Sequence, residues 1–294
     1  MDQTTAIMDI GVDYISMSLK REERNYQEWV GNGTSTLLSV AEQGNEMRAG
    51  TFQGYEGYFC AGLFCGQRAD GAHLHIPGSR ANEYFNPLFH PRANYSRLDI
   101  QTTVKVEPFE LDYAKQMSTL AEVANEKLPE NRRRRVLLMS DNGGGRTCYI
   151  GKRTSPVFCR AYNKEATSTE EIYTHCWRFE VELHNHIAKK VAHLLHSVNG
   201  KIYANIASMV WQTYRDRGIE PPYTKTMENT ALPIMKHIES DVDKRLRWLA
   251  EQVRPTVQRL LAAGYGDIVL ESLGLGDRLP IENSSIATEG GYDG

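Results

Sequence analysis

The stretch Thr147–Leu183 decides the fold that this sequence predicts, and it reads TCYIGKRTSPVFCRAYNKEATSTEEIYTHCWRFEVEL. Two runs typical of β-strands, Thr147–Arg153 and Pro156–Lys164, are joined by a two-residue turn. A third run of this kind, His175–Leu183, follows a polar loop. Strands this short and this close in sequence predict part of an antiparallel sheet.

Alternation along these strands gathers charged side chains around one tyrosine. Successive side chains of a strand point to opposite faces, so Arg160, Tyr162 and Lys164 share a face. The third strand presents a second set on one face: Arg178, Glu180 and Glu182. A tyrosine between two cations, near an arginine and two carboxylates, is an arrangement suited to handling phosphate.

Tyr162 needs activation before it can act as a nucleophile. A phenol has a pKa near 10, so only about one tyrosine in a thousand is ionised at neutral pH. Arg160 and Lys164 would supply cations, and a divalent ion held by Glu180 and another carboxylate would polarise a phosphodiester. The alternative is an ordinary strand tyrosine with flanking charges in solvent. Spacing alone favours that alternative, because tyrosines are common in strands.

The order of short motifs in this stretch resembles that of the replication initiation factor family of rolling-circle plasmids and related mobile elements. The family pattern reads Y-x-G-x-R-x-S, then R-x-Y-N-K, then R-x-E-x-E-L. A further match lies upstream in SRLDI, where Arg97 and Asp99 fall on an expected strand, and the resemblance spans roughly Asp13 to Gly274. The matching positions of the three main motifs are Tyr149, Gly151, Arg153, Ser155, Arg160, Tyr162, Asn163, Lys164, Arg178, Glu180, Glu182 and Leu183.

The resemblance implies a role for each of these side chains. Tyr162 would nick one DNA strand and stay attached to its 5′-phosphate. Asp99 and Glu180 would be ligands of Mg²⁺ or Mn²⁺, with Glu182 either a further ligand or a group that orients the first. Such an exchange replaces one phosphodiester with another, so rejoining the strand would need no ATP. The residues implied to hold the scissile phosphate are Arg160, Lys164 and Arg178.

The charge pattern favours a polyanionic partner locally but not globally. The chain has 294 residues, a formal net charge of −3 and a pI near 6.3, so it lacks a global basic field. Residues 131–164 carry nine Lys and Arg side chains against Asp141 alone. The alternative is that this run is a solvated face. The candidate DNA-binding residues here are Arg132, Arg133, Arg134, Arg135, Lys152 and Arg153.

A histidine pair and the cysteines offer competing site types. His73 and His75 fall on one face of an expected strand, which is the metal-binding signature of another class of tyrosine nickases. The resembled family uses carboxylates instead, so the alternative is a solvent-facing pair. The five cysteines include no C-x-x-C pair and predict reduced thiols, many of them in the core, with no zinc site.

The remaining periodicity predicts an α+β protein. Strands are expected at 10–19, 55–66, 72–77, 96–105 and 136–140. Helices are expected at 26–41, 109–126, 187–197, 201–217, 241–263 and 267–273, with Pro255 kinking or splitting the fifth. No internal repeat is visible in the sequence. The position of Asp13 favours a charged residue at the end of a strand over a member of a metal site.

These elements predict a domain organisation. A mostly antiparallel catalytic sheet domain with packed helices spans 9–183, a helical C-terminal region for origin recognition spans 184–280, and a disordered tail spans 281–294. Neither a membrane-spanning run nor a signal peptide is visible, so the cytoplasm is the expected compartment. The expected partners are DNA, a second copy of the chain and a host helicase.

Two other functions remain open at this point. A relaxase that nicks a transfer origin for conjugation would use the same chemistry. A non-catalytic DNA-binding regulator would need none of Tyr162, Asp99 and Glu180, so their presence argues against it. A tyrosine recombinase fits less well, because those enzymes place the tyrosine near the C-terminus.

Overall fold

A computed structural model of the chain describes residues 4–107, 109, 113–140, 145–198, 202–223, 249, 253–266 and 268–269. The chain forms two compact units, 1–235 and 236–294. The expected disordered tail at 281–294 lies outside the described residues. No helix in the described ranges has the length and apolar character needed to cross a membrane.

The first unit is built on a ten-stranded sheet in which every paired strand is antiparallel. The strand order is β2-β3-β4-β5-β1-β6-β10-β9-β8-β7. This architecture confirms the expected α+β class with a mostly antiparallel sheet. The strands are β1 (Thr4–Lys20), β2 (Met47–Phe52), β3 (Tyr55–Cys60), β4 (Leu63–Arg68), β5 (Gly71–Pro77), β6 (Asn94–Glu107), β7 (Val136–Ser140), β8 (Arg146–Ile150), β9 (Val157–Asn163) and β10 (Cys176–His184).

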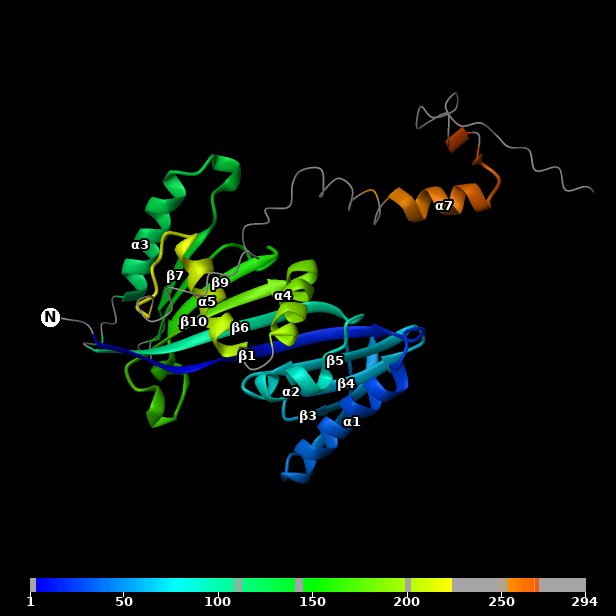
Figure 1. Cartoon of the computed structure of the whole chain (residues 1–294), viewed down its shortest axis with the longest axis horizontal. Helices are drawn as coiled ribbons and strands as arrows, with labels where there is room; N and C mark the ends of the chain where they lie inside the picture. The colour runs from blue at the N-terminus through cyan, green and yellow to red at the C-terminus, as the bar shows by residue number, and fades with distance from the viewer. Residues whose placement is uncertain are drawn as a thin grey trace, which may run out of the picture. The chain divides into compact units, whose positions relative to one another are not determined.

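The two halves of the sheet follow the same chain path. In the first half a long strand, β1, leads into helix α1 (Tyr26–Glu42) and then into a four-strand meander whose last strand returns to β1. In the second half β6, helix α3 (Tyr113–Glu126) and the meander β7–β10 repeat this path. The long strands β1 and β6 pair with each other at the centre (Figure 1). The repeat that the sequence does not show is therefore present in the topology.

The helices cover one face of this sheet. Gly33 of α1 approaches Leu74 of β5, whose side chain points away from the face that carries His73. Tyr214 of helix α5 (Ile202–Arg215) packs edge-on against Phe179 of β10, which likewise alternates with Glu180. Helix α4 (Asn185–Ser197) completes this layer with α5 (Figure 1). Tyr162 and the charged residues lie on the opposite face of the sheet.

The core explains why β10 is fixed in place. All its residues except the last are buried, and Trp177, Phe179, Val181 and Leu183 alternate toward the helices. Burying side chains of this size contributes about 1.5–3 kcal/mol each. A shift of β10 by one residue would turn these side chains outward, so the apolar face also fixes where the polar face lies.

Several element boundaries differ from the sequence expectation. The run expected as one strand at 55–66 is a hairpin, β3–β4, because Ala61 and Gly62 adopt positive φ values of 46° and 85°. Strand β2 and helix α2 (Arg80–Leu88) were not expected at all. Helix α2 contains Pro87 near its end. Because proline favours turns, the sequence predicted a turn-rich connection here instead of a helix.

The helical expectations after residue 183 are met where the chain is described. Helices α4 and α5 lie within the ranges 185–197 and 202–215 and pack on the sheet. In the second unit, helix α7 (Arg254–Ala262) has Pro255 in its first turn, where proline is favoured, and Val253 just before it is π-helical. Ile268 and Val269 are helical, and the rest of 267–273 lies outside the described residues.

Candidate active site

Strands β9 and β10 bring Tyr162 and Glu180 together. In their register Tyr162 lies opposite Arg178, and Arg160 lies opposite Glu180. The Tyr162 hydroxyl reaches diagonally and donates to Glu180 Oε1 at 2.6 Å. Arg160 Nε donates to the second oxygen of the same carboxylate. One carboxylate therefore binds both the tyrosine and its neighbouring arginine.

The surroundings of Tyr162 keep the phenol protonated. Burial raises its pKa above the usual value, the negative charge of Glu180 raises it further, and Arg178 opposes both effects. Glu180 is 1% exposed, so its charge is poorly screened. Tyr162 can act as a nucleophile only if its proton leaves as it attacks, and Glu180 Oε1 is within hydrogen-bond reach of that proton.

A second pair of carboxylates lies on the adjacent strands β6 and β10. Asp99 and Glu182 are direct partners in the register. Arg97 holds Asp99 through two hydrogen bonds of 2.9 and 2.6 Å, and its Nη2 lies 2.8 Å from Glu182 Oε2. Burial raises the pKa of Asp99 to about 6, against the lowering effect of Arg97. His184 Nε2 lies 2.9 Å from the other oxygen of Glu182.

Arg178, on β10, connects that strand to β6 and β1. Its Nε donates to Thr103 Oγ1 at 2.8 Å, and its two terminal nitrogens donate to Asp9 and Asp13 at 3.1 and 3.3 Å. Burial raises the pKa of Asp13 to about 6, and Glu180 adds to this effect. Asp13 is therefore part of the charged cluster, where the sequence had favoured an isolated strand-end charge.

The carboxylates are of the right type for a metal but do not surround one in this arrangement. Oxygen donors are what Mg²⁺ and Mn²⁺ prefer. The described part of the chain contains no group of three His, Cys, Asp or Glu side chains in a metal-binding arrangement. Arg97 occupies the space between Asp99 and Glu182, and Arg160 holds Glu180. Metal binding would require Arg97 to leave these oxygens.

Comparison with known protein families identifies the family of this chain. The sequence profile of the family described as replication initiation factor matches residues 93–273. The chain belongs to the replication initiation factor family. The match covers Arg97, Asp99, Tyr162 and Glu180, and it leaves the first half of the sheet outside.

Among solved structures, a rolling circle replication initiator protein from Geobacillus stearothermophilus is similar to this initiation factor. The TM-score is 0.47 and the sequence identity is 16%, over 79% of this chain and 92% of that chain. No curated protein sequence matches the chain.

Lys164 is near the tyrosine of this initiation factor but is not on its strand. Strand β9 ends at Asn163, and Lys164 begins the short 3₁₀ helix η2 (Lys164–Thr167). The strand is therefore one residue shorter than expected, and Lys164 still interacts electrostatically with Arg178, Asp13 and Glu180 of the charged cluster. Its ammonium lies 5.3 Å from the Tyr173 ring, and burial and Arg178 lower its pKa.

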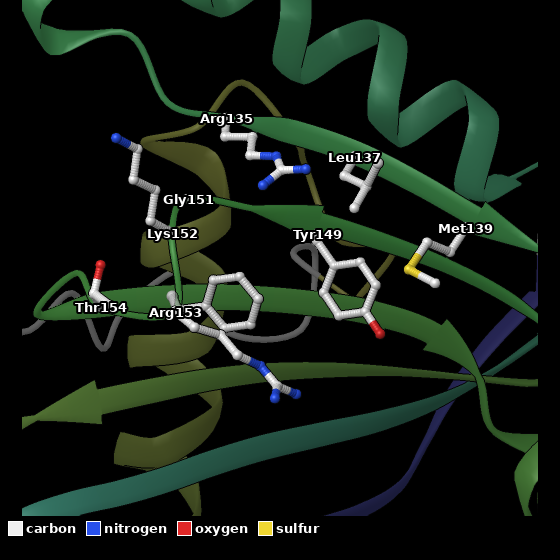
Figure 2. Close-up of a pocket in the computed structure, with 9 residues that line it drawn as sticks. Arg135, Leu137, Met139, Tyr149, Gly151, Lys152, Arg153 and Thr154 are labelled. Carbon is white, nitrogen blue, oxygen red and sulfur yellow. The ribbon is translucent and has the colours of Figure 1, made fainter.

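The four consecutive arginines, Arg132–Arg135 (the arginine run), do not form one uniform surface. Arg134 is half-buried, and burial together with Arg217 lowers its pKa. Arg132 and Arg133 are exposed around the short 3₁₀ helix η1 (Glu130–Arg132). The remaining cations expected to bind DNA line a separate pocket (Figure 2): Arg135, Lys152 and Arg153.

The histidine pair is structural. His73 is 2% exposed and lies 3.2 Å from Ser16 Oγ, and His75 Nδ1 lies 2.9 Å from the Tyr14 hydroxyl. Burial lowers the pKa of both imidazoles to about 4. The expectation of a solvent-facing pair is wrong for His73, because the ring packs between aromatic side chains that include Tyr55.

Two groups of residues in the site were not assigned from the sequence. Asp9 lies far from Tyr162 in sequence and reaches Arg178 only because β1 and β6 pair in the centre of the sheet. Arg97 was visible in the R-x-D motif, but its contact with both Asp99 and Glu182 depends on the register of β6 and β10. The cysteines play no part here, since all five are buried and unpaired.

Proposed function

We propose that this initiation factor starts rolling-circle replication by nicking one DNA strand with Tyr162. The observation that carries the proposal is the contact between the Tyr162 hydroxyl and the buried Glu180 carboxylate, on the sheet face opposite the helices. A protein that only binds DNA has no need for a buried carboxylate to accept a hydrogen bond from a tyrosine. A nucleophilic phenol does need one, because its own pKa is far above neutrality.

The proposed step is a transesterification at phosphorus. Tyr162 Oη forms a bond to the scissile phosphorus while the bond from phosphorus to the 3′-oxygen breaks. The phenolic proton passes to Glu180 Oε1, and the leaving 3′-oxygen takes up a proton from solvent. The product is a 5′-phosphotyrosyl linkage and a free 3′-hydroxyl. The reverse reaction rejoins a strand without an external energy source.

The cations around Tyr162 are suited to the charge that develops on the phosphate. Arg160 is partly exposed and can turn one nitrogen toward an incoming phosphate while Nε stays on Glu180. Lys164 approaches from η2 as a mobile point charge. Arg178 already donates to three protein acceptors, so we assign it mainly to orienting the phenol and offsetting charge.

A divalent ion would complete the charge balance. The cluster contains five carboxylates and four cations, which gives a formal charge of 4 − 5 = −1 before any phosphate enters. We propose that Asp99 and Glu182 hold Mg²⁺ or Mn²⁺ when Arg97 moves aside, which leaves Glu180 to accept the phenolic proton. When bound, such an ion polarises phosphate oxygens. The charged groups counted are Asp9, Asp13, Asp99, Glu180, Glu182, Arg97, Arg160, Lys164 and Arg178.

Two partners extend the proposal beyond the single chain. A second copy would supply another Tyr162 for the cut that ends a replication round. A host helicase would separate the strands behind the nick. Sedimentation of the protein with and without DNA tests the dimer.

A plasmid nicking assay tests the proposed function. Supercoiled plasmid that carries the DNA flanking the gene of this protein is incubated with Mg²⁺ and each variant. The unsubstituted chain should convert it to the open circle, and Tyr162→Phe should not. Tyr58→Phe is the matched control, because this tyrosine is 52% exposed and lies on β3, in the other half of the sheet. Specific binding without nicking by any variant would favour a non-catalytic regulator.

A further inference from the structure

A pocket beside the tyrosine has no role in the proposed reaction. It has a volume of about 470 Å³, in the range of small-ligand sites. Strands β7, β8 and β9 and the turn after β8 form it. Its lining consists of Arg135, Leu137, Met139, Tyr149, Gly151, Lys152, Arg153, Thr154 and Phe158.

The pocket lies on the same sheet face as the site. Tyr149 is the direct register partner of Arg160, which holds Glu180. Phe158 precedes Tyr162 by four residues on β9, a separation of roughly 13 Å along a strand. A few nucleotides span this distance, so a DNA strand bound at Tyr162 is long enough to reach the pocket.

The floor of the pocket suits a flat ring. The rings of Tyr149 and Phe158 lie almost parallel, with centroids 5.8 Å apart and planes at 17°. Leu137 and Met139 on β7 add apolar side chains that are 37% and 52% exposed. In the view of Figure 2 the Tyr149 ring lies next to Leu137 and Met139, and the Arg135 and Arg153 side chains lie to its left.

The rim of the pocket suits a phosphate backbone. Arg135, Lys152 and Arg153 line it, and no ion pair joins any of them to an acidic side chain within the described ranges. Gly151, at a φ of 106°, donates to the Arg135 carbonyl at 2.8 Å and fixes the turn that carries two of these cations. Aromatic rings with cations beside them are the usual means of holding single-stranded DNA.

We infer that this pocket binds an unpaired base of the DNA strand that carries the scissile phosphate. The inference rests on the proposed function, since it takes that strand as the ligand. The base stacks on Tyr149, and Arg135, Lys152 and Arg153 contact the flanking phosphates. A base in a duplex is stacked and paired already, so the pocket selects DNA that is single-stranded next to the nick site.

The test compares two probes of equal charge. In a Tyr162→Phe background, which prevents covalent attachment, fluorescence anisotropy measures binding of fluorescein-labelled oligodeoxythymidine and of an abasic oligomer of the same length. Tyr149→Leu should weaken binding of oligodeoxythymidine roughly five- to a hundredfold and leave the abasic oligomer unchanged. Arg153→Gln should weaken both probes together and reduce the salt dependence of each.

Controls separate folding and assembly from recognition. Tyr58→Leu replaces a tyrosine on β3 that is 52% exposed and should change neither affinity. An unchanged thermal midpoint shows that Tyr149→Leu is folded. Equal effects of Tyr149→Leu on both probes, no effect on either, or a change of sedimentation coefficient without a change in probe preference would each overturn the inference. Absence of nicking by the unsubstituted protein, with intact discrimination between the probes in the Tyr162→Phe background, would overturn the proposed function alone.

Discussion

Tyr162 and Glu180 lie on neighbouring strands, diagonal to each other, and their side chains meet at 2.6 Å on the face of the sheet that carries the charged cluster. Glu180 also binds Arg160, and Tyr214 of α5 donates to the Glu180 main-chain oxygen at 3.0 Å. The side chain of Glu180 is therefore held on one face of the sheet, and its main chain is held by the helix on the other. Substitutions in this charged cluster and its surroundings should therefore have measurable effects.

Glu180→Gln should slow nicking while keeping the shape of the site. The amide cannot take the proton of Tyr162, and removal of a general base typically lowers a rate by about 10²–10⁴. The variant should also unfold more easily by about 1–3 kcal/mol, because it leaves Arg160 without its charge partner. Single-turnover nicking and urea unfolding measure the two effects. A variant with an undiminished rate would remove Glu180 from the role of base.

Divalent ions should stabilise the protein through the carboxylates of β6 and β10. Mg²⁺ or Mn²⁺ at a hundredfold excess over its Kd would add about 3 kcal/mol to the unfolding free energy. The double variant Asp99→Asn/Glu182→Gln should lose this gain. Thermal unfolding with added chloride salts makes the comparison without any DNA. Equal stabilisation of both proteins would place the ion elsewhere.

His73 should make the fold sensitive to mild acid. Its folded pKa of about 4 lies below the usual 6.5, so the folded state binds fewer protons than the unfolded state between these values. Stability from this group is therefore present above pH 6.5 and is lost as the pH falls toward 4. The loss at pH 5 is on the order of 2 kcal/mol.

The raised pKa values of Asp13 and Asp99 act in the opposite direction over the same pH range, so a variant isolates the contribution of His73. His73→Asn should flatten the acid side of the stability profile relative to the unsubstituted protein. Urea unfolding at pH 7 and pH 5 measures the difference. Parallel profiles for the two proteins would show that His73 does not contribute.

The arginine run should divide into residues that contact DNA and residues that do not. Arg135→Gln should reduce the slope of log affinity against log salt for single-stranded DNA by about 0.7, as expected for one lost phosphate contact. Arg134→Gln should leave that slope unchanged, because Arg134 is half-buried near Arg217. Equal slopes for the two variants would contradict the assignment of Arg135 to the pocket.

The sequence predicted the part of the site that lies within strands. Alternation along β9 and β10 correctly placed Arg160, Tyr162, Arg178 and Glu180 on one face, because the apolar residues between them have a single buried side to occupy. Alternation does not reveal which strands are neighbours. The contacts of Arg178 with Asp9 and Asp13 depend on the central pairing of β1 with β6, which no local pattern shows.

Local chemistry explains the other differences. The end of β9 at Asn163 is fixed by a long-range bond, in which the Asn163 side chain accepts from the Arg146 main chain at 2.7 Å. Lys164 lies in η2, although the alternation continues through it in the sequence. The polarity of His73 predicts an exposed side chain. In the structure, aromatic neighbours from three strands bury it.

Capture of the covalent intermediate tests the central claim most directly. The protein is incubated with single-stranded DNA from the region flanking its gene and with Mg²⁺ or Mn²⁺, then digested and analysed by peptide mass spectrometry. The account predicts a nucleotide linked through phosphate to the peptide that contains Tyr162, absent from Tyr162→Phe. A phosphotyrosyl adduct on another tyrosine, or cleavage of the DNA by Tyr162→Phe at the rate of the unsubstituted protein, would contradict it.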